Sequence, residues 1–284
     1  MPGQQTASAR VAFATCAALP DLDDDEAAPI APLAARGVRA EPVVWNEPGV
    51  DWDAFDLVVI RATWDFVDHR PEFVAWAQSV PRLANSADIV RWGTDKTYLR
   101  DIAAAGVPVA DTTWLTPGIR PILPNDGVYV VKPSVSCGSR DTGRYDLRDA
   151  AHRDLAADLV DRLLADGRTV MVQPYLHAVD TVGETGLVFI GGRFSHAIRK
   201  GAMLDGPAAD IVGLYKPEKI TRRVPSDAEL RTARRVLAAV PGGPEALLYA
   251  RVDLIPDADG TPTLLELEAV DPTLFLSHDD GAAE

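Results

Sequence analysis

The segment DLVVIRATW, residues 56–64, constrains the fold of this chain more than any other feature. A short apolar run bounded by polar residues is typical of a strand buried on both faces of a parallel sheet. The neighbouring elements are expected to be two further strands and two helices, at 11–15, 38–45, 25–36 and 71–80. Because strands and helices alternate, the sequence predicts a small doubly wound α/β domain over residues 1–88.

The other two thirds of the chain predict a mixed α+β architecture. Helices are expected at 94–106, 150–166 and 227–240, and strands at 107–115, 127–133 and 169–176. Two hairpins are expected, one at 185–201 around Gly191–Gly192 and one at 247–268. Residues 203–224 lack a clear period and are expected to form a loop. We divide this part into a small subdomain, residues 89–172, and a C-terminal subdomain, residues 173–284.

The charge of the chain argues against two classes of partner. The 284 residues carry a formal net charge of -14. Such a chain is repelled by nucleic acids and by anionic membrane surfaces, although local positive charge can still hold a phosphate-bearing small ligand. We therefore expect no nucleic-acid partner and no membrane partner.

The N-terminal apolar run VAFATCAAL, residues 11–19, has the length of a signal-peptide core. Only Arg10 precedes it as a positive charge, and the acidic stretch DLDDDE follows it, which favours a buried first strand. No run approaches the roughly 20 apolar residues of a membrane span. The two cysteines, Cys16 and Cys137, form neither a metal-binding spacing nor a disulfide framework. These features predict a cytoplasmic protein.

The terminal hairpin places charged residues on one face. If Asp259-Gly260 forms a two-residue type I′ turn, Asp253 pairs with Glu266, and Arg251 pairs with Glu268. Because side chains alternate along a strand, these four share one face. The opposite face is expected to belong to the core and consists of Val252, Leu254, Leu265 and Leu267.

Two readings of this charged face stay open from the hairpin alone. Carboxylates directly across a ladder repel each other, and a cation between them reverses the sign of that interaction. Three carboxylates are oxygen donors that suit Mg²⁺ or Mn²⁺ better than zinc. The alternative is a solvated polar face in which Arg251 makes an ordinary salt bridge.

Two other positions combine strand ends with polar side chains. Lys132 ends a strand and precedes the small-residue segment SVSCGSRDTGRY, an arrangement that suits phosphate binding but also an ordinary solvent-exposed lysine. Arg61, Thr63 and Asp65 follow the central strand of the first domain, at the edge where α/β sheets bind ligands. Loop capping explains them equally well.

The order of the motifs is more specific than any one of them. The chain contains TDKTYLRDIAAAGVPVADT, VVKPSVSCGSRDTGR, VQPYLHAVDTVGETGLVFIGGRFSHAIRKG, YARVDL and LLELEAVDPTLF in that order. This series resembles the ATP-grasp superfamily, and within it the glutathione-synthetase-like ligases, from about residue 89 to residue 284. The resemblance implies two α+β subdomains that close on ATP, and an acyl-phosphate intermediate.

The resemblance also implies roles for individual residues. Lys96 and Lys132 would contact the ATP phosphates. Gln173 and the main chain of Tyr175 and Leu176 would contact the adenine. Glu184 would bind the ribose, and Asp180 is a second candidate for that role. Arg199 would face the transferred phosphate and would be catalytic together with Lys132. The metal-binding acids would be Asp253, Glu266 and Glu268. These acids would hold one or two Mg²⁺ ions, or Mn²⁺. At Glu268 an acid replaces the amide that is usual in the family.

The substrate is suggested by PDLDDDE, IRATWDF and VKPSVSCGSRDTGRY. Together these segments resemble a group of ATP-grasp ligases that includes an enzyme forming D-cycloserine from O-ureido-D-serine in antibiotic biosynthesis. Arg61, Asp65 and Arg251 are candidate substrate contacts, and the acidic loop at residues 23–25 is a candidate site for a substrate amine. The alternatives are a peptide-type carboxylate–amine ligase of another pathway and a non-catalytic ATP-binding module. The expected partners are ATP and a small amino-acid-like substrate, and the expected assembly, if any, is a homodimer.

Overall fold

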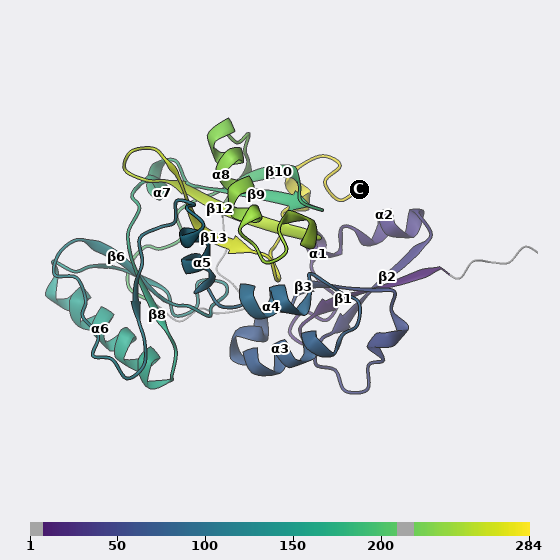
Figure 1. Ribbon diagram of the computed structural model, residues 1–284, viewed down its shortest axis with the longest axis horizontal. Helices are drawn as coiled ribbons and strands as arrows, with labels where there is room; N and C mark the ends of the chain where they lie inside the picture. Colours follow the sequence, from purple (N-terminus) through teal and green to yellow (C-terminus); the bar gives the residue numbers. More distant parts are fainter. Residues whose placement is uncertain (1–7, 209–218) are drawn as a thin grey trace, which may run out of the picture.

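The computed structural model describes residues 8–208 and 219–284, which form three sheets (Figure 1). The first sheet has the strand order β2-β1-β3-β4, the second β5-β8-β6-β7, and the third β11-β10-β9-β12-β13. Each sheet is built from one continuous part of the chain. The α/β and α+β classes that the sequence predicts are both present.

The N-terminal sheet is parallel throughout. Its strands are β1 (Ala9–Thr15), β2 (Val38–Val44), β3 (Leu57–Ala62) and β4 (Leu83–Ala84). One face packs against α3 (Arg70–Ser79) and α4 (Ala87–Gly93), and the other against α2 (Ile30–Ala35). Because helices cover both faces, β3 is buried almost along its whole length, and the predicted doubly wound arrangement is confirmed.

The prediction of a single helix at 25–36 is wrong, because the structure has two short helices there. These are α1 (Asp24–Ala27) and α2, separated at Pro29. Proline has no N–H to donate to the preceding turn, and its ring restricts the residue before it, so the first helix ends there. Single-turn 3-10 helices follow at Trp52–Ala54 and Trp64–Asp68.

The middle sheet is antiparallel and is covered on one face by α6 (Ala150–Ala165). Its strands are β5 (Thr113–Leu115), β6 (Val128–Pro133), β7 (Gly143–Asp146) and β8 (Val170–Pro174). The strand expected at 107–115 is shorter than predicted, and Val109 instead forms an isolated bridge with Leu264. Strand β7 was not predicted because it lies inside a segment rich in small and charged residues.

The C-terminal sheet contains both predicted hairpins. Its strands are β9 (Glu184–Ile190), β10 (Arg193–Lys200), β11 (Ile220–Arg222), β12 (Tyr249–Pro256) and β13 (Pro262–Glu268). The short helix α7 (Ala178–Thr181) precedes β9. Strand β11 was missed, since its region was expected to be a loop; residues 209–218 of that region lie outside the described residues.

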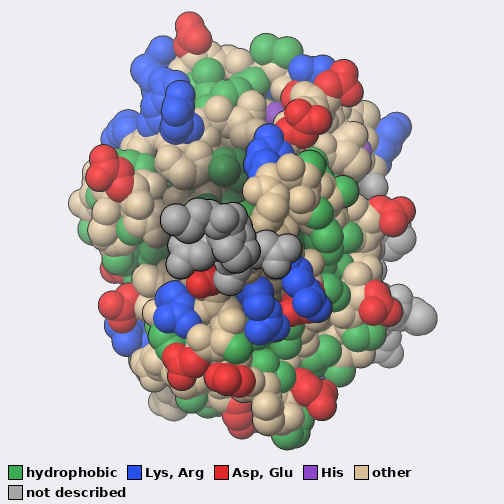
Figure 2. Space-filling model, turned by 90° about the vertical axis from the view of Figure 1, so that its right-hand side faces the viewer, with side chains coloured by type: hydrophobic (Ala, Val, Ile, Leu, Met, Phe, Trp, Pro, Cys, Tyr) green, Lys and Arg blue, Asp and Glu red, His purple; other side chains and the backbone are tan. Residues whose placement is uncertain are grey.

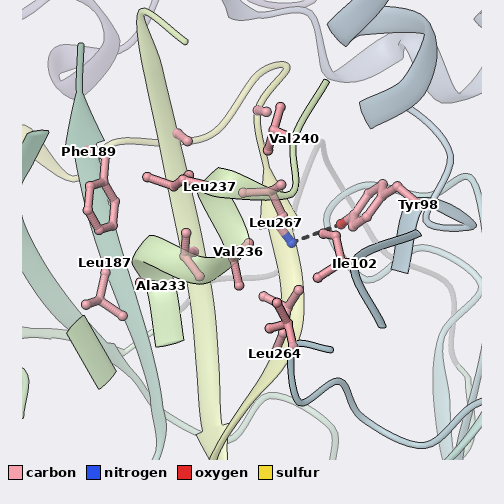
Figure 3. Packing of buried hydrophobic residues seen from close by; sticks show 14 of the residues in the cluster. Tyr98, Ile102, Leu187, Phe189, Ala233, Val236, Leu237, Val240, Leu264 and Leu267 are labelled. Atoms are coloured by element: carbon pink, nitrogen blue, oxygen red, sulfur yellow. Dashed lines mark hydrogen bonds between the residues drawn. The ribbon is translucent and has the colours of Figure 1, made fainter. Parts of the chain in front are cut away.

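The largest core lies between the C-terminal sheet and two helices (Figure 3). Helix α8 (Asp227–Ala238) begins with a capping box between Ser226 and Glu229, and it covers β12 and β13. Helix α5 (Tyr98–Ala104) packs into the same core, and the Leu267 N–H donates to the Tyr98 hydroxyl at 2.9 Å. Residues 89–107, which we had assigned to the small subdomain, therefore contribute side chains to the core of the C-terminal sheet.

The terminal hairpin has the predicted pairing near the site but a different loop. Arg251 pairs with Glu268 and Asp253 with Glu266, as expected. The loop is longer than two residues, however, because Pro256 pairs with Pro262, and a bulge next to Asp253 restores the register. The bulged residue is Leu265, which lines a pocket instead of joining the core face with Val252, Leu254 and Leu267. The expected Asp259-Gly260 loop was therefore wrong, while the pairing of the charged residues was right.

The segment after β13 returns to the N-terminal sheet. Leu274 and Leu276 belong to the core cluster that contains Val11 and Phe13 of β1. The Tyr249 hydroxyl lies 2.9 Å from the Ile60 carbonyl and 2.6 Å from the Val270 carbonyl, so it links β3 to this segment. The N-terminal and C-terminal sheets are thus joined by buried contacts beside the end of β3.

The surface mixes charges of both signs. On the face in Figure 2, Lys and Arg side chains are interspersed with Asp and Glu. Among the described residues, no helix combines the length and the apolar character needed to cross a membrane.

Candidate active site

One large pocket lies where the middle sheet, the C-terminal sheet and the end of the N-terminal domain meet. Strands β6 and β8 line it on one side, and β13 with residues 269–271 lines it on the other. It brings together most of the residues that the sequence selected, namely Lys96, Lys132, Gln173, Tyr175, Leu176, Glu184, Arg251, Glu266 and Glu268.

Lys96 connects Glu266 to the loop that follows β6. Its Nζ lies 3.0 Å from Glu266 Oε1 and donates to the Ser136 carbonyl at 2.7 Å. Burial alone would lower the pKa of Lys96, but Glu266 raises it above its ordinary value. Burial likewise acts to raise the pKa of Glu266, but Lys96 and Lys132 bring it below its ordinary value. Both groups are therefore charged at neutral pH.

Arg251 lies between two carboxylates on the same face of the hairpin. Its Nε donates to Asp253 at 2.9 Å, and its Nη2 contacts Glu268 at 2.5 Å. Its Nη1 donates to the Thr273 carbonyl at 2.7 Å. Burial raises the pKa of Glu268 despite Arg251, whereas Asp253, which is fully buried, has its pKa held well below the ordinary range by Arg251 and Lys200 against the effect of burial.

Lys200, at the end of β10, lines the pocket although it is not among the candidate residues of the sequence. Its Nζ lies 2.5 Å from Glu184 and 2.8 Å from Asp253. Burial raises the pKa of Glu184 to about 7, although Lys200 opposes the shift. Arg199, predicted to face the transferred phosphate, lies on the other side of the strand and donates to the carbonyls of Val182 and Thr181. It is not among the residues that line the pocket.

Among the lysines of the pocket, Lys132 has the fewest anionic partners for its charge. It is 8% exposed, and no ion pair or hydrogen bond of its ammonium group occurs within the described part of the chain. Burial lowers its pKa, with Lys96 and Lys200 acting in the same direction. A buried cation of this kind favours an anionic ligand.

The residues at the end of β8 form hydrogen bonds with several different parts of the chain. Gln173 donates to the Thr112 hydroxyl at 2.9 Å, and the main-chain N–H of Tyr175 donates to the Val128 carbonyl at 2.8 Å. Asp180, the second candidate for ribose binding, accepts from the Tyr175 hydroxyl at 2.6 Å and does not line the pocket.

The candidate substrate residues of the N-terminal domain have mostly structural partners. Arg61 forms a buried ion pair with Glu26 and does not line the pocket. Asp65 accepts from the Trp45 indole at 2.9 Å. In the acidic loop, Asp23 caps α1, and Asp25 accepts from the Ser277 N–H at 3.0 Å. These contacts explain the acidic loop by capping.

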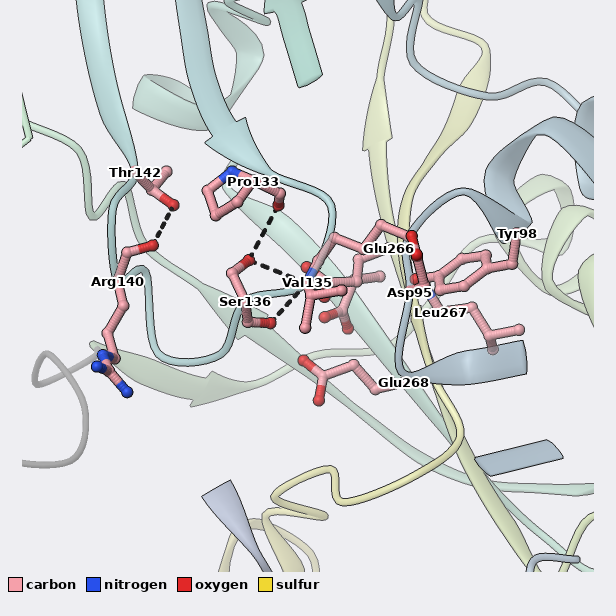
Figure 4. A network of polar contacts seen from close by, with 12 residues as sticks. Asp95, Tyr98, Pro133, Val135, Ser136, Arg140, Thr142, Glu266, Leu267 and Glu268 are labelled. Atoms are coloured by element: carbon pink, nitrogen blue, oxygen red, sulfur yellow. Dashed lines mark hydrogen bonds and ion pairs between the residues drawn. The ribbon is translucent and has the colours of Figure 1, made fainter. Parts of the chain in front are cut away.

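The loop over residues 134–142 lies beside the paired acids (Figure 4). Ser136 lies close to Glu266 and Glu268, where Lys96 contacts both its carbonyl and its hydroxyl. Farther along, Arg140 pairs with Asp68 of the N-terminal domain at 2.8 Å. Asp141 pairs with Arg162 and Arg168 of the small subdomain. The loop thus bridges two parts of the molecule above the pocket.

Comparison with known proteins identifies the family. The protein-family model for the N-terminal domain of D-cycloserine synthetase DcsG matches residues 11–85 of this chain. The cycloserine biosynthesis protein DcsG of Streptomyces lavendulae is 39% identical over 267 residues, which cover 87% of this chain and 86% of that protein. The chain belongs to the D-cycloserine synthetase DcsG family.

Solved structures agree with this family. The crystal structure of D-cycloserine synthetase DcsG superposes with a TM-score of 0.84 at 36% identity and covers 96% of both chains. An ATP complex of D-alanine–D-alanine ligase from Bacillus anthracis has a TM-score of 0.61 at 13% identity, with 95% of this chain and 89% of that one covered. The ATP-grasp ligase PsnB with a minimal precursor, Mg and ADP has a TM-score of 0.59 at 20% identity, covering 96% and 94%. The predicted ATP-grasp fold is confirmed, and this member of the DcsG family is an ATP-dependent ligase.

The donor set of the pocket fits a magnesium ion that is held together with a nucleotide. Within residues 8–208 and 219–284, no three His, Cys, Asp or Glu side chains are arranged to hold a metal by themselves. Mg²⁺ usually binds through one or two carboxylates together with phosphate oxygens and water. Glu266 and Glu268 lie on one face of β13 and line the pocket, so they provide such a pair.

Asp271 is a pocket residue that sequence reasoning missed. It is 7% exposed, and its carboxylate accepts from the Thr63 hydroxyl at 3.3 Å. Its carbonyl accepts from the Trp64 indole at 3.2 Å. The available signal was its position three residues after Glu268 in the motif LLELEAVDPTLF, but a single acid near a proline is also common in turns.

Proposed function

We propose that this chain makes D-cycloserine from O-ureido-D-serine with ATP, as a step of antibiotic biosynthesis. The observation that carries the proposal is the likeness to DcsG over 87% of the chain, together with a pocket that contains the paired acids and the lysines. A fold-level likeness alone would not support a substrate, since ATP-grasp ligases act on many substrates.

The nucleotide end of the pocket is assigned to the middle sheet and the segment after β8. Lys132 and Lys96 contact the phosphates, where the lack of an ion pair for Lys132 within the described residues supports its role. The adenine is held by Gln173, the Tyr175 carbonyl and the Leu176 N–H, because the Tyr175 N–H is already used by Val128. Glu184 is assigned to the ribose, where it would exchange its contact with Lys200 for a hydroxyl group.

Glu266 and Glu268 are assigned to one or two Mg²⁺ ions, or Mn²⁺. When bound, the metal would neutralise negative charge on the phosphate groups of ATP. Asp253, also expected as a ligand, is enclosed by Arg251 and Lys200, so we assign it to holding these two cations in place. The pair Arg251–Glu268 offsets the additional negative charge at the position where the family often has an amide.

The proposed chemistry is the acyl-phosphate route that the resemblance to ATP-grasp ligases implies. The substrate carboxylate accepts the γ-phosphoryl group, which gives an acyl phosphate and ADP. A substrate nitrogen then attacks the acyl carbon, forms the carbon–nitrogen bond and releases inorganic phosphate. O-ureido-D-serine contains both reacting groups, so the same step closes a ring. The carbamoyl group on the ring nitrogen is then lost by hydrolysis as carbon dioxide and ammonia, which leaves D-cycloserine. Lys200 is assigned to the phosphate-facing position that we expected for Arg199, because Lys200 lines the pocket.

The proposal is tested by incubating the purified chain with ATP, Mg²⁺ and O-ureido-D-serine. We expect release of phosphate and formation of D-cycloserine, measured by a coupled phosphate assay and by mass spectrometry. Phosphate release only after a second amine is added would instead favour a peptide-type ligase. ATP binding without phosphate release from any amino-acid derivative would favour a non-catalytic module.

The setting that accompanies this function has three parts. ATP use and the two free cysteines support a cytoplasmic location. The ligands are ATP and a small amino-acid-like substrate, without nucleic acid or membrane. The assembly is proposed to be at most a homodimer, which light scattering of the purified chain would measure.

A further inference from the structure

Asp271 occupies the end of the pocket where the C-terminal sheet meets the N-terminal domain. It lies three residues after Glu268 and lines the pocket together with Thr94 and Val270. The side chain is held from the N-terminal domain by the Thr63 hydroxyl. Its position is therefore defined by both domains.

Asp271 differs from the other pocket carboxylates in how its negative charge is balanced by neighbouring cations. Glu266 lies 3.0 Å from Lys96, Glu268 lies 2.5 Å from Arg251, and Glu184 lies 2.5 Å from Lys200. Asp271 is more buried than any of these three, yet within residues 8–208 and 219–284 it has no ion pair. A charged carboxylate that is buried without a cation is costly, so Asp271 either takes up a proton or binds a cation that the described residues do not supply.

We infer that Asp271 binds the α-ammonium group of the amino-acid substrate and thereby orients the substrate carboxylate toward the phosphates. This inference rests on the proposed function, because it uses the same pocket and the same substrate class. An amino acid has its ammonium and carboxylate groups on one carbon. An ammonium group on Asp271 would therefore direct the carboxylate toward Glu268 and Lys96, whose charges act on Asp271 and between which we propose that the phosphoryl group is transferred.

The charge around Asp271 supports a cationic ligand. Burial, followed by the neighbouring Glu268, raises the pKa of Asp271 to about 8, although the Thr63 hydroxyl and the Lys96 ammonium group act to lower it. A carboxyl group in this state takes up a proton when no other cation is present. Asp65 lies near it and adds negative charge, and burial raises the pKa of Asp65 as well. A substrate ammonium group would relieve the repulsion among these acids.

The geometry also gives the N-terminal domain a role in substrate choice. Thr63 and Trp64 directly follow β3, and they hold the side chain and the carbonyl of Asp271, respectively. Ligands in α/β folds bind at this edge of the sheet. Thr63 is therefore a positioning residue that acts through Asp271, while Asp271 contacts the substrate.

The test compares two substrates in the full-length wild type and in Asp271→Asn, which keeps the side-chain volume. The substrates are O-ureido-D-serine and its analogue in which hydrogen replaces the α-amino group. We expect Asp271→Asn to lower kcat/KM about 100-fold for the amino substrate, mainly through KM, because one partner of a buried charge pair is removed. The loss for the analogue should be under about threefold, and KM for ATP should stay unchanged. Equal losses for both substrates would overturn the inference.

Two further variants separate binding from folding. Thr63→Val should give a smaller loss, about 10-fold, again only for the amino substrate. Asp88→Asn, at an exposed carboxylate of α4, is the matched control and should behave as the wild type. Thermal unfolding of every variant shows whether it is folded at the assay temperature. If Asp271→Asn is not folded there, Asp271→Ser, which also removes the carboxylate, takes its place, and an unchanged preference for the amino substrate in that variant would contradict the inference.

Failure of the proposed function has a different signature. It appears already in the wild type, as O-ureido-D-serine that stays unchanged in the presence of ATP. The amine requirement is then measured with the D- or L-amino acid that elicits phosphate release and with its counterpart lacking the amine. A wild type that uses both forms equally well would overturn the role of Asp271 whatever the product is.

Discussion

Two buried charge systems lie close together in this molecule and are built differently. In the pocket, Arg251 contacts Asp253 and Glu268 and also donates to a carbonyl, so its guanidinium group is well provided with acceptors. In the N-terminal domain, Arg61 and Glu26 form an ion pair with each other and no other ion pair within the described residues. Both carboxylate oxygens of Glu26 and two guanidinium nitrogens of Arg61 make no hydrogen bond within the described residues.

The difference indicates what each system can do. A network in which each charge has several partners can exchange one of them for a ligand without leaving a bare charge. An isolated pair has no such reserve, because loss of its single partner exposes the full cost of burial. The pocket network is therefore suited to binding and turnover, and the Glu26–Arg61 pair to holding the fold.

The largest effect is expected when the pocket network loses Arg251. Arg251→Met leaves Asp253 and Glu268 buried without their shared cation, so we expect a stability loss of about 4 kcal/mol and loss of ligase activity. Urea unfolding and phosphate release measure the two effects. Arg235→Met, at an arginine on α8 outside the pocket, is the control. Near-normal activity of Arg251→Met would contradict the central place of Arg251.

The isolated pair should respond to single and double substitutions in opposite ways. Above about pH 8, where Glu26 is charged, Arg61→Met alone leaves it without a partner and should cost about 3 kcal/mol in the free energy of unfolding. The double variant Glu26→Leu with Arg61→Met should recover most of that loss, because two apolar residues replace a poorly hydrogen-bonded pair. A double variant as unstable as the single one would show that the pair contributes more than its mutual attraction.

The position of Lys200 predicts an effect on catalysis. Lys200→Met should lower kcat about 100-fold, since the cation that we assign to the phosphates is removed from the pocket. The neighbouring Arg199→Met provides the matched control and should stay within about twofold of the wild type. Single-turnover phosphate release measures both. A larger loss for Arg199→Met than for Lys200→Met would restore the expectation drawn from the sequence.

The isolated pair should also appear in the pH dependence of stability. Burial raises the pKa of Glu26 to about 8 despite Arg61, whereas the pKa of an unfolded glutamate lies near its ordinary value of 4.5. Between these values the folded state retains a proton that the unfolded state has released, so stability falls as pH rises. Relative to Glu26→Gln, the wild type should lose about 2 kcal/mol between pH 6 and pH 8. Equal slopes for the two proteins in urea unfolding would contradict this.

The smallest effect is expected for the exposed ion pair between Arg140 and Asp68. Arg140→Gln should raise KM for ATP about twofold at low salt, because the loop over the pocket loses one tie to the N-terminal domain. At high salt the difference from the wild type should vanish, since such pairs are screened. Arg148→Gln, which removes an exposed pair outside the pocket, is the control. A salt-independent change would assign Arg140 a direct role at the phosphates.

The periodic parts of this fold could be predicted from the sequence, and its local irregularities could not. Apolar runs such as residues 57–62 and the caps of α8 report burial and helix ends directly. The strands β7 and β11 are too short to show a period. In the terminal hairpin, the longer loop and the bulge at Leu265 shift the register in opposite directions, and the two shifts cancel. The pairing of the charged residues was therefore predicted correctly, although the predicted loop was wrong.

The candidate site shows the same limit. Motif order selects a lysine or arginine near the end of β10, but only the strand's alternation relative to the pocket decides between Arg199 and Lys200. Asp271 depends on contacts with Thr63 and Trp64, which lie more than 200 positions earlier in the chain. Such long-range contacts have no local pattern.

The return of the chain to the N-terminal sheet has a consequence for biosynthesis of the protein. Leu274 and Leu276 pack on β1, and Ser277 bonds to Asp25, which precedes it by 252 positions. During translation the N-terminal sheet can form early, but one of its faces stays partly bare until residues 274–277 have left the ribosome. The sheet formed by β1 to β4 is therefore completed only after residues 274–277 have been made.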